Sequence, residues 1–385
     1  MGGTTTIDGY SRFNKSYAAW LLKNVEMEPF GDTKPPIYQS VPRTTQESDF
    51  QDMARKLDSG NAFIYHLAEG TSLKLQEEYT DLESRDLLRD KLVAIHCTAI
   101  TPAQWAKIGQ HRVKFVWSPL SNFLLYGRTA DVVSAKNNTV LICLGSDWSP
   151  SGSKSVLWEL KVAYLVNMND LNNAFSDQEL VEMITINPAK AVGWDDMIGR
   201  IVPGHIADLV AFDRVSNDPY RNVIESTEEN LKLAIVDGIP RCGDLELMNE
   251  LEVTPSDRVR VGSREKAFDI FEPGLKYGDI TLHKAQSALR ATMADPKTAA
   301  QNLSTRLSVS LEEEPLRLIV EDDVEPIGVA IEDTIEWFLN LDADTLNTLP
   351  KKLDPLTMSE DKDFIAGLKA NQNVPKYLHK LEEYL

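Results

Sequence analysis

Three side chains able to bind a metal ion or move a proton stand at the ends of apolar runs in the first half of the chain. His66 and His96 each end a short apolar run, and Asp147 follows a third one. Imidazole and carboxylate groups hold catalytic metals and serve as general acids and bases. If the fold brings these residues together, they could hold a metal ion, a water or a substrate ring.

The spacing of the apolar runs indicates how the fold could do this. Runs at 62–66, 92–96, 115–118 and 140–147 recur every 20–30 residues or so, about the length of a strand plus one crossover helix. Such units form parallel strands covered by helices. A barrel of this type carries its chemistry at the C-terminal strand ends, where the three residues would converge. An open doubly wound sheet is the alternative, but the polar strand ends favour the barrel.

Further strands are expected over 2–7 and 37–42, which makes six. Helices are expected over 14–23, 45–57, 82–90, 155–166 and 177–186, and from residue 101 onward. A closed barrel needs eight strands, so two are unaccounted for, and both would lie before Met1. The sequence therefore predicts an incomplete barrel.

Composition excludes several classes of partner. The formal charge of −19 disfavours nucleic acid and anionic membrane surfaces, and no basic run interrupts it. No apolar stretch reaches the roughly 18 residues of a membrane-spanning helix. Three cysteines, Cys97, Cys143 and Cys242, suit a reducing compartment better than a disulfide framework. We therefore expect a cytoplasmic protein whose partner is a small-molecule substrate, and leave homo-oligomerisation open.

An ordered series of short motifs resembles one enzyme family. The motifs are His66-Leu-Ala-Glu69, Ile95-His96-Cys97, Trp117-Ser-Pro-Leu-Ser-Asn122, Leu144-Gly-Ser-Asp147, Thr185-Ile-Asn-Pro-Ala-Lys-Ala-Val-Gly193 and the stretch from Ile198 to Asp213. Together, over residues 1 to about 245, they resemble the second half of the metal-dependent amidohydrolase superfamily. The branches with the guanine, cytosine and adenosine-like deaminases and the triazine hydrolases are most similar.

The resemblance implies a role for each polar strand-end residue. His66 would be a metal ligand, and Asp147 would bind the metal and take the proton from the attacking water. His96 would polarise the water and the developing oxyanion, and Glu69 would protonate the leaving or ring nitrogen. The metal would be one divalent ion, zinc before iron. These residues also have plainer interpretations. A strand-end histidine is often a core residue, and Glu69 could simply cap a helix.

A substrate contact is implied for three more residues. The family pattern places Ser118 and Asn122 on the substrate ring, although both flank a proline and could only shape a turn. Trp148 would wall the pocket, unless it packs in the core.

One feature of the family is missing. Its members carry His-x-His on the first barrel strand, and this pattern occurs nowhere in the 385 residues. We expect that the sequence starts too late and lacks that strand. The alternative is a short paralogue that has lost the metal and acts as a binding or scaffold protein.

The resulting expectation is an α/β protein of the (β/α)8 amidohydrolase type with an incomplete barrel over 1–198. A partial β-sandwich would follow over 199–275, with strands at 207–213, 233–240 and 258–261 and a hairpin turn at Asp237-Gly238. Residues 276–385 would form an acidic, mainly helical extension, either a solvated tail or a module for a basic partner. Its helices are expected over 282–293, 331–341 and 364–370. The expected function is metal-dependent hydrolysis of a carbon–nitrogen, non-peptide bond in a heterocyclic amine or cyclic amide.

Overall fold

A computed structural model describes most of the chain, in nine stretches. They are residues 2–9, 21–25, 28–40, 43–148, 151–272, 274, 278–307, 345 and 352–384, with side chains 303, 304, 306 and 307 not described. The chain divides into two compact units, one of Met1–Asp279 with Leu356–Leu385 and one of Ile280–Pro355. No helix in these stretches is both long and apolar enough to cross a membrane.

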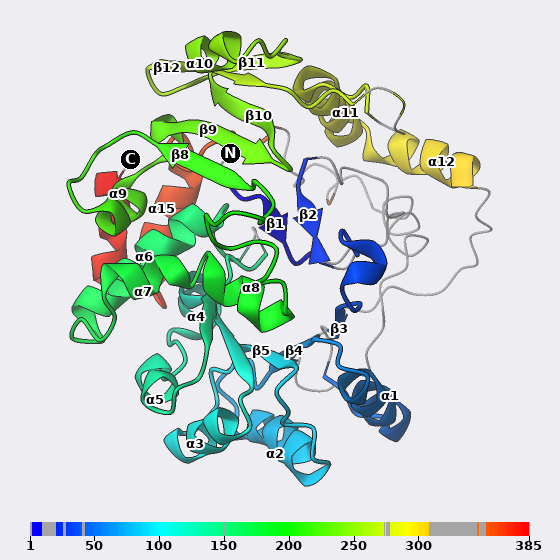
Figure 1. Ribbon diagram of the computed structural model, residues 1–385, viewed down its shortest axis with the longest axis vertical. Helices are drawn as coiled ribbons and strands as arrows, with labels where there is room; N and C mark the ends of the chain where they lie inside the picture. Colours follow the sequence, from blue (N-terminus) through cyan, green and yellow to red (C-terminus); the bar gives the residue numbers. More distant parts are fainter. Residues whose placement is uncertain are drawn as a thin grey trace. The chain divides into compact units, whose positions relative to one another are not determined.

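A five-stranded parallel sheet organises the first unit (Figure 1). Its strands, in spatial order, are β3 (Tyr38–Ser40), β4 (Phe63–Leu67), β5 (Leu92–His96), β6 (Lys114–Trp117) and β7 (Ile142–Leu144). Neighbours follow one another in sequence and are all parallel, as expected for helical crossovers. Within the described residues β3 and β7 are the two edges, and the sheet does not close on itself.

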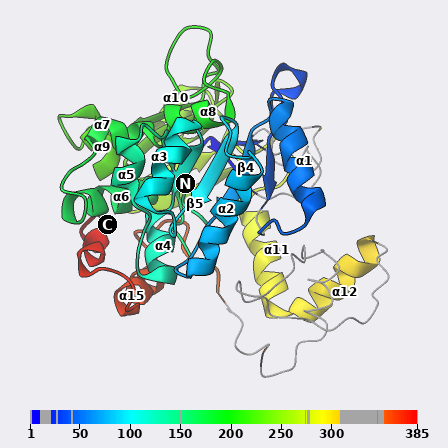
Figure 2. The same cartoon turned by 90° about the horizontal axis from the view of Figure 1, so that it is seen from below.

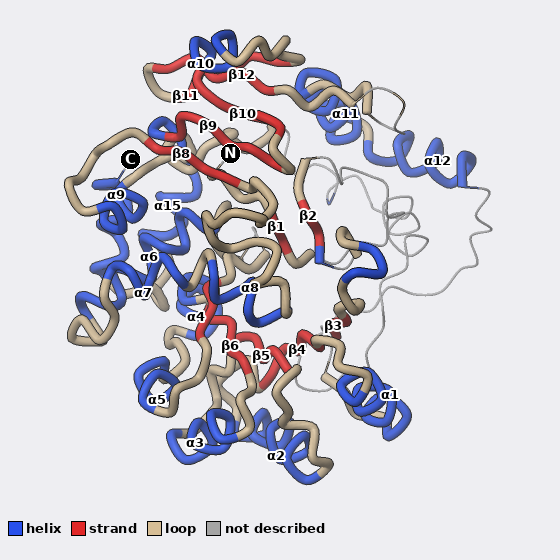
Figure 3. The backbone as a smooth tube through the Cα atoms, viewed as in Figure 1, coloured by secondary structure: helices blue, strands red, loops and turns tan. Residues whose placement is uncertain are grey.

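Helices connect these strands and cover the sheet. They are α1 (Glu47–Asp58), α2 (Gln76–Ser84), α3 (Pro102–Gln110), α4 (Pro119–Tyr126), α5 (Val132–Asn137), α6 (Val156–Asn169), α7 (Asp177–Glu182), α8 (Ile186–Val192) and α9 (Pro219–Glu225). Figures 2 and 3 show α1, α2 and α3 along one side of the sheet. Short 3-10 helices lie at η2 (Gly31–Thr33), η3 (Leu73–Leu75) and η4 (Glu228–Asn230).

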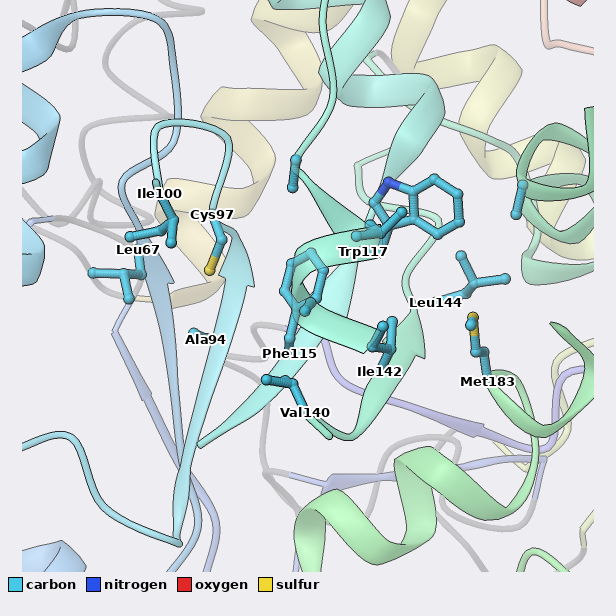
Figure 4. Close-up of a cluster of buried hydrophobic side chains, with 14 of the residues drawn as sticks. Leu67, Ala94, Cys97, Ile100, Phe115, Trp117, Val140, Ile142, Leu144 and Met183 are labelled. Carbon is cyan, nitrogen blue, oxygen red and sulfur yellow. The ribbon is translucent and has the colours of Figure 1, made fainter. Parts of the chain in front are cut away.

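Both faces of the sheet are apolar, as a doubly covered parallel sheet requires. Alternate strand residues such as Leu67, Phe115 and Trp117 pack against the helices in one large buried cluster, part of which Figure 4 shows. The residues between them, including Ile64 and Val93, form a second cluster with Trp194 and Ile198, which follow α8. Burying each large apolar side chain contributes about 1.5–3 kcal/mol, so the sheet is a rigid platform for the groups at its ends.

The second sheet is antiparallel and also has five strands, in the order β11-β12-β10-β9-β8. Its elements are β8 (Leu209–Phe212), β9 (Leu231–Val236), β10 (Ile239–Asp244), α10 (Leu245–Glu250), β11 (Asp257–Val261) and β12 (Arg264–Phe268). Asp237 and Gly238 form the turn between β9 and β10 with φ of 54° and 79°, as a two-residue hairpin prefers. The hairpin turn expected at Asp237-Gly238 is therefore confirmed, and it divides the strand expected over 233–240 between β9, which ends at Val236, and β10, which begins at Ile239.

Several expected elements differ from the structure. The strand expected over 2–7 is only β1 (Thr6–Ile7), which pairs with β2 (Lys23–Asn24) outside the main sheet, so that sheet has five of the six expected strands. The helix expected over 82–90 is wrong, since α2 ends at Ser84 and Asp86 has a left-handed φ of 55°. The helix expected over 177–186 is split into α7 and α8. Those expected over 14–23 and 331–341 lie outside the described residues, except for 21–23.

The C-terminal residues do not form one extension. The second unit contains α11 (Leu282–Ala294) and α12 (Pro296–Leu307), whereas α15 (Lys362–Ala370) and η5 (Lys376–Tyr384) belong to the first unit. Leu368, Leu378 and Leu381 are buried in the large cluster of the parallel sheet. The last 30 residues are therefore not a solvated tail, because their apolar side chains complete the core.

Candidate active site

The carboxyl end of the parallel sheet brings the expected polar residues together. His66 is the fourth residue of β4, His96 is the last residue of β5, and Asp147 follows β7 by three positions. Because the strands are parallel and in register, all three lie at the same end of the sheet. Three side chains from distant parts of the chain can thus share one site.

An unusual backbone conformation directs the side chain of His96 towards this site. In the register between β4 and β5, Leu67 lies opposite His96 and Ile95 lies opposite His66. Simple alternation would therefore put the two histidines on opposite faces of the sheet. His96 has φ of 64°, which breaks the alternation, and its ring centroid lies 5.3 Å from that of His66.

Asp147 and Ala68 share this conformation, with φ of 58° and 52°. A left-handed φ is costly for residues other than glycine, of the order of 1–3 kcal/mol each, and such strain gathers at functional sites. The carboxylate of Asp147 is held by two hydrogen bonds: the backbone N–H of Trp148 donates to Oδ1 over 2.7 Å, and the hydroxyl of Ser121 donates to Oδ2. The strained turn thereby fixes where the carboxylate points.

The candidate acid, base and ligand groups are close enough to act on one small molecule. Donor atoms of His66, Glu69 and His96 all lie within 4.8 Å of one another. Nε2 of His96 is 3.4 Å from Oε2 of Glu69 and 3.9 Å from Oδ2 of Asp147. Two imidazoles and two carboxylates therefore face a common space.

Helix α4 contacts three of these four groups. Ser121 bonds to Asp147, as described, and the amide Nδ2 of Asn122 lies 3.1 Å from Nδ1 of His96. The hydroxyl of Tyr126 donates to Oε1 of Glu69 over 2.9 Å. One eight-residue helix therefore positions both carboxylates and the imidazole of His96.

A chain of hydrogen bonds fixes the tautomer of His96. The indole N–H of Trp117 donates to Oγ1 of Thr129 over 2.6 Å, and Thr129 donates to Oδ1 of Asn122 over 3.2 Å. This orients Asn122 so that its NH2 group donates to Nδ1 of His96. In a neutral imidazole the hydrogen then sits on Nε2, the atom that faces Glu69 and Asp147. In this tautomer His96 donates a hydrogen towards the site.

Burial keeps both histidines neutral. Desolvation lowers the pKa of His96 to about 4, although the charge of Asp147 opposes the shift. Desolvation also lowers the pKa of His66, again against the charge of Asp147. Nδ1 of His66 is buried and has no hydrogen-bond partner among the described residues. A neutral, unpartnered imidazole nitrogen beside a carboxylate suits a metal ion.

A third carboxyl group supports the site from behind. Glu159 of α6 is fully buried, accepts from the backbone N–H of Leu120 over 2.9 Å and bonds to the hydroxyl of Ser153. Burial raises the pKa of Glu159 to about 8, and its hydrogen bonds oppose the shift. Glu159 thus ties the start of α4 to the loop that follows Asp147.

The residues expected to contact substrate have different surroundings. Ser118 and Asn122 are buried at 1% and 0% exposure, whereas Trp148 is 73% exposed. Asn122 uses both ends of its amide on Thr129 and His96. The sequence interpretation missed Ser121, Tyr126, Thr129 and Glu159. A signal existed for Tyr126, because the i, i+4 spacing from Asn122 places both on one side of a helix.

Comparison with known proteins agrees with this geometry. Residues 56–239 match the sequence model of the amidohydrolase family. The chain is therefore similar to this family over slightly less than half of its length. An S-triazine hydrolase of Gordonia rubripertincta is 30% identical over 129 residues, which are 33% of this chain and 27% of that protein. A 5-methylthioadenosine/S-adenosylhomocysteine deaminase of Thermoanaerobacter pseudethanolicus is 26% identical over 187 residues, 47% of this chain and 43% of that one.

The chain thus spans less than half of the length of each of these two relatives. Among solved structures, an adenosine deaminase from Xanthomonas campestris with bound zinc superimposes with a TM-score of 0.55 and 19% identity, over 62% of this chain and 66% of that one. The α/β fold with a parallel sheet is therefore shared with this adenosine deaminase.

Proposed function

We propose that this protein is a metal-dependent hydrolase of carbon–nitrogen bonds other than peptide bonds. The observation that carries the proposal is the group of neutral histidines and carboxylates at the sheet end, with His66, Glu69 and His96 within 4.8 Å and Asp147 beside His96. The substrate would be a heterocyclic amine or a cyclic amide. The sequence relatives named S-triazine hydrolase and 5'-deoxyadenosine deaminase support this class.

His66 and Asp147 would hold one divalent metal ion, zinc in preference to iron. The unpartnered nitrogen of His66 and the fixed carboxylate of Asp147 fit such an ion. When bound, the ion would acidify a water molecule and so supply hydroxide at neutral pH.

The other groups would divide the proton transfers among them. Asp147 would take the proton from the attacking water, since its carboxylate already faces the site. Glu69 would donate a proton to the leaving or ring nitrogen, as an acid held by Tyr126 in a fixed position. His96 would donate its Nε2 hydrogen to the oxygen on which negative charge develops, and so stabilise the transition state.

Substrate binding would involve the residues around α4. We keep Ser118 and Trp148 as proposed contacts, with the exposed indole of Trp148 available to cover a ring. The buried amide of Asn122 supports a different role, in which it acts on the substrate only through His96.

The sheet would be the second half of a (β/α)8 barrel, and the antiparallel sheet would be part of a β-sandwich. A catalytic zinc usually has three protein ligands, whereas His66 and Asp147 supply two. The two edge strands, β3 and β7, are where further strands would add. A His-x-His strand next to β7 would then complete the ligand set.

The second candidate function is that of a metal-free binding or scaffold protein. One observation favours it, namely that His-x-His is absent from the sequence. It predicts a folded protein that binds heterocycles without metal and without turnover.

Metal analysis separates the two candidates. The protein is prepared without a tag, dialysed against zinc and then against metal-free buffer, and assayed by atomic emission. We expect about one equivalent of zinc, lost in His66→Ala and kept in His111→Ala, which alters a histidine at the end of α3. If wild type retains no zinc or iron, the hydrolase proposal fails for this chain.

A further inference from the structure

The C-terminal segment Leu356–Leu385 packs beside the candidate active site although it lies far from the family match, which ends at residue 239. Val374 and Leu378 of this segment are buried in the same core as Phe123 of α4. The segment is therefore part of the structure around α4.

Two asparagine side chains of this segment bond to the last turn of α4. Nδ2 of Asn371 donates to the carbonyl of Leu124 over 3.2 Å, and Nδ2 of Asn373 lies 3.3 Å from the same carbonyl and 3.4 Å from that of Leu125. The last carbonyls of a helix have no partner within the helix and need one elsewhere. Asn371 and Asn373 supply it.

The end of α4 is shaped to admit these side chains. Gly127 ends the helix with φ of 67°, a left-handed conformation that favours glycine. A Cβ atom at this position would lie 3.5 Å from Oδ1 of Asn373. The backbone N–H of Asn373 donates to Oδ1 of Asn371 over 2.8 Å, and Val374 anchors the turn in the core. The side-chain amide of Asn371 is thus held at both ends, next to the exposed amide of Asn373.

The same segment also contacts the loop that follows Asp147. Lys154 forms an ion pair with Asp361, in which both side chains are largely buried. Asp361 also caps α15, where its Oδ1 accepts from the N–H of Phe364 over 2.9 Å. The segment therefore reaches both the helix that positions Glu69 and His96 and the loop that carries the base.

We propose that Leu356–Leu385 is an integral part of the active site, with Asn371 and Asn373 as positioning residues that fix α4 and, through it, the catalytic groups. This inference rests on the proposed function for its catalytic consequence. Movement at the end of α4 would first displace Tyr126, which adjoins the capped carbonyls and holds Glu69. The segment thus acts on the acid without touching the substrate.

The test compares Asn371→Ala/Asn373→Ala with Tyr377→Phe. Tyr377 bonds to Asp170 at the end of α6, so the control also removes a hydrogen bond that anchors this segment but leaves α4 capped. Four quantities are measured in each variant. They are the free energy of unfolding, the zinc affinity, the turnover and the hydrogen-exchange rate of the Gly127 amide, which donates to Phe123 within α4.

In the asparagine variant we expect the Gly127 amide to exchange about tenfold faster, kcat to fall by a similar factor and KM to change little. In Tyr377→Phe the exchange rate and kcat should stay near wild type. Equal effects of the two variants, or faster exchange with unchanged kcat, would overturn the positioning role. Asn371→Asp/Asn373→Asp keeps the side-chain volume without the donors and must behave like the alanine variant. Absence of zinc and turnover in wild type would instead refute the proposed function and the catalytic part of this inference, while the exchange rates would still decide the contact.

Discussion

The hydroxyl of Tyr126 donates a hydrogen bond to Oε1 of Glu69 over 2.9 Å, although 57 residues separate the two in sequence. Oε2 of the same carboxyl group faces Nε2 of His96 at 3.4 Å. Glu69 is thus held on one oxygen and directed into the site on the other, which is the geometry a proton donor requires.

Tyr126→Phe should lower turnover by about tenfold, because a hydrogen bond to a carboxyl group contributes roughly 1.5–3 kcal/mol and its loss frees Glu69 to rotate. Zinc content should not change. The measurement is kcat in a deaminase and amidase screen of the zinc-loaded protein. Tyr79→Phe is the control, because the hydroxyl of Tyr79 bonds to Glu83 within α2. A full loss of zinc in Tyr126→Phe would contradict this role.

Asp147→Asn should retain the fold, since the amide has nearly the same volume and still accepts from the N–H of Trp148. It should lower turnover by about 10²–10⁴-fold, the typical contribution of a general base. Zinc should bind more weakly, because a neutral oxygen is a poorer ligand than a carboxylate. Asp86→Asn, which alters a carboxylate that is 83% exposed, is the control. Unchanged turnover in Asp147→Asn would remove this residue from the mechanism.

Asn122→Asp should reverse the tautomer of His96. A carboxylate only accepts, so the hydrogen of the imidazole moves to Nδ1 and Nε2 loses it. Loss of one oxyanion donor lowers turnover by about 10²–10³-fold. The ¹⁵N chemical shifts of the two ring nitrogens report the tautomer directly, with His66 as an internal reference. If the hydrogen stays on Nε2 in the variant, the chain of hydrogen bonds from Trp117 to His96 does not fix the tautomer.

Glu159→Gln should flatten part of the pH dependence of stability. The pKa of Glu159 is raised to about 8 in the folded protein from an ordinary 4.5, so the folded state keeps a proton that the unfolded state releases. The free energy of unfolding therefore falls as pH rises from 4.5 to 8, by at most about 1.4 kcal/mol per pH unit. Glutamine carries no such proton and can bond to both Leu120 and Ser153.

Urea unfolding of Glu159→Gln and wild type at several pH values measures this difference. The advantage of the variant should grow from pH 4.5 to 8 and be constant outside that window. Glu246→Gln, on the exposed side of α10, provides the control. A difference between Glu159→Gln and wild type that does not vary with pH would show that the carboxyl group titrates normally.

The strands of the parallel sheet could be predicted because their apolar runs are short, buried on both faces and followed by polar residues. The ends of β4, β5 and β7 then located His66, His96 and Asp147 without any structure. The turn at Asp237-Gly238 was equally predictable, because both residues must adopt a positive φ there and few residue types do so.

The helices were harder to locate. Residues 119–126 of α4 are mostly apolar, so they show no amphipathic period, and Pro119 suggested a turn where it is the first helical residue. The hydrogen-bonding role of Tyr126 depends on a contact with Glu69 that only the tertiary fold creates. The position of the C-terminal segment was predicted wrongly for another reason. Its many acidic residues indicated a solvated tail, whereas Leu368, Leu378 and Leu381 are buried in the core.

The attachment of Asp147, His96 and Glu69 to α4 has a consequence for mutational studies of this protein. Ser121, Asn122 and Tyr126 sit on one short rigid body, so a change that shifts α4 displaces all of their partners together. Double-mutant cycles between these positions should therefore show large coupling energies, with a second substitution costing much less than the first. For an engineer who wants a new substrate, α4 is a unit to be replaced whole, because the effects of separate substitutions in it will not add.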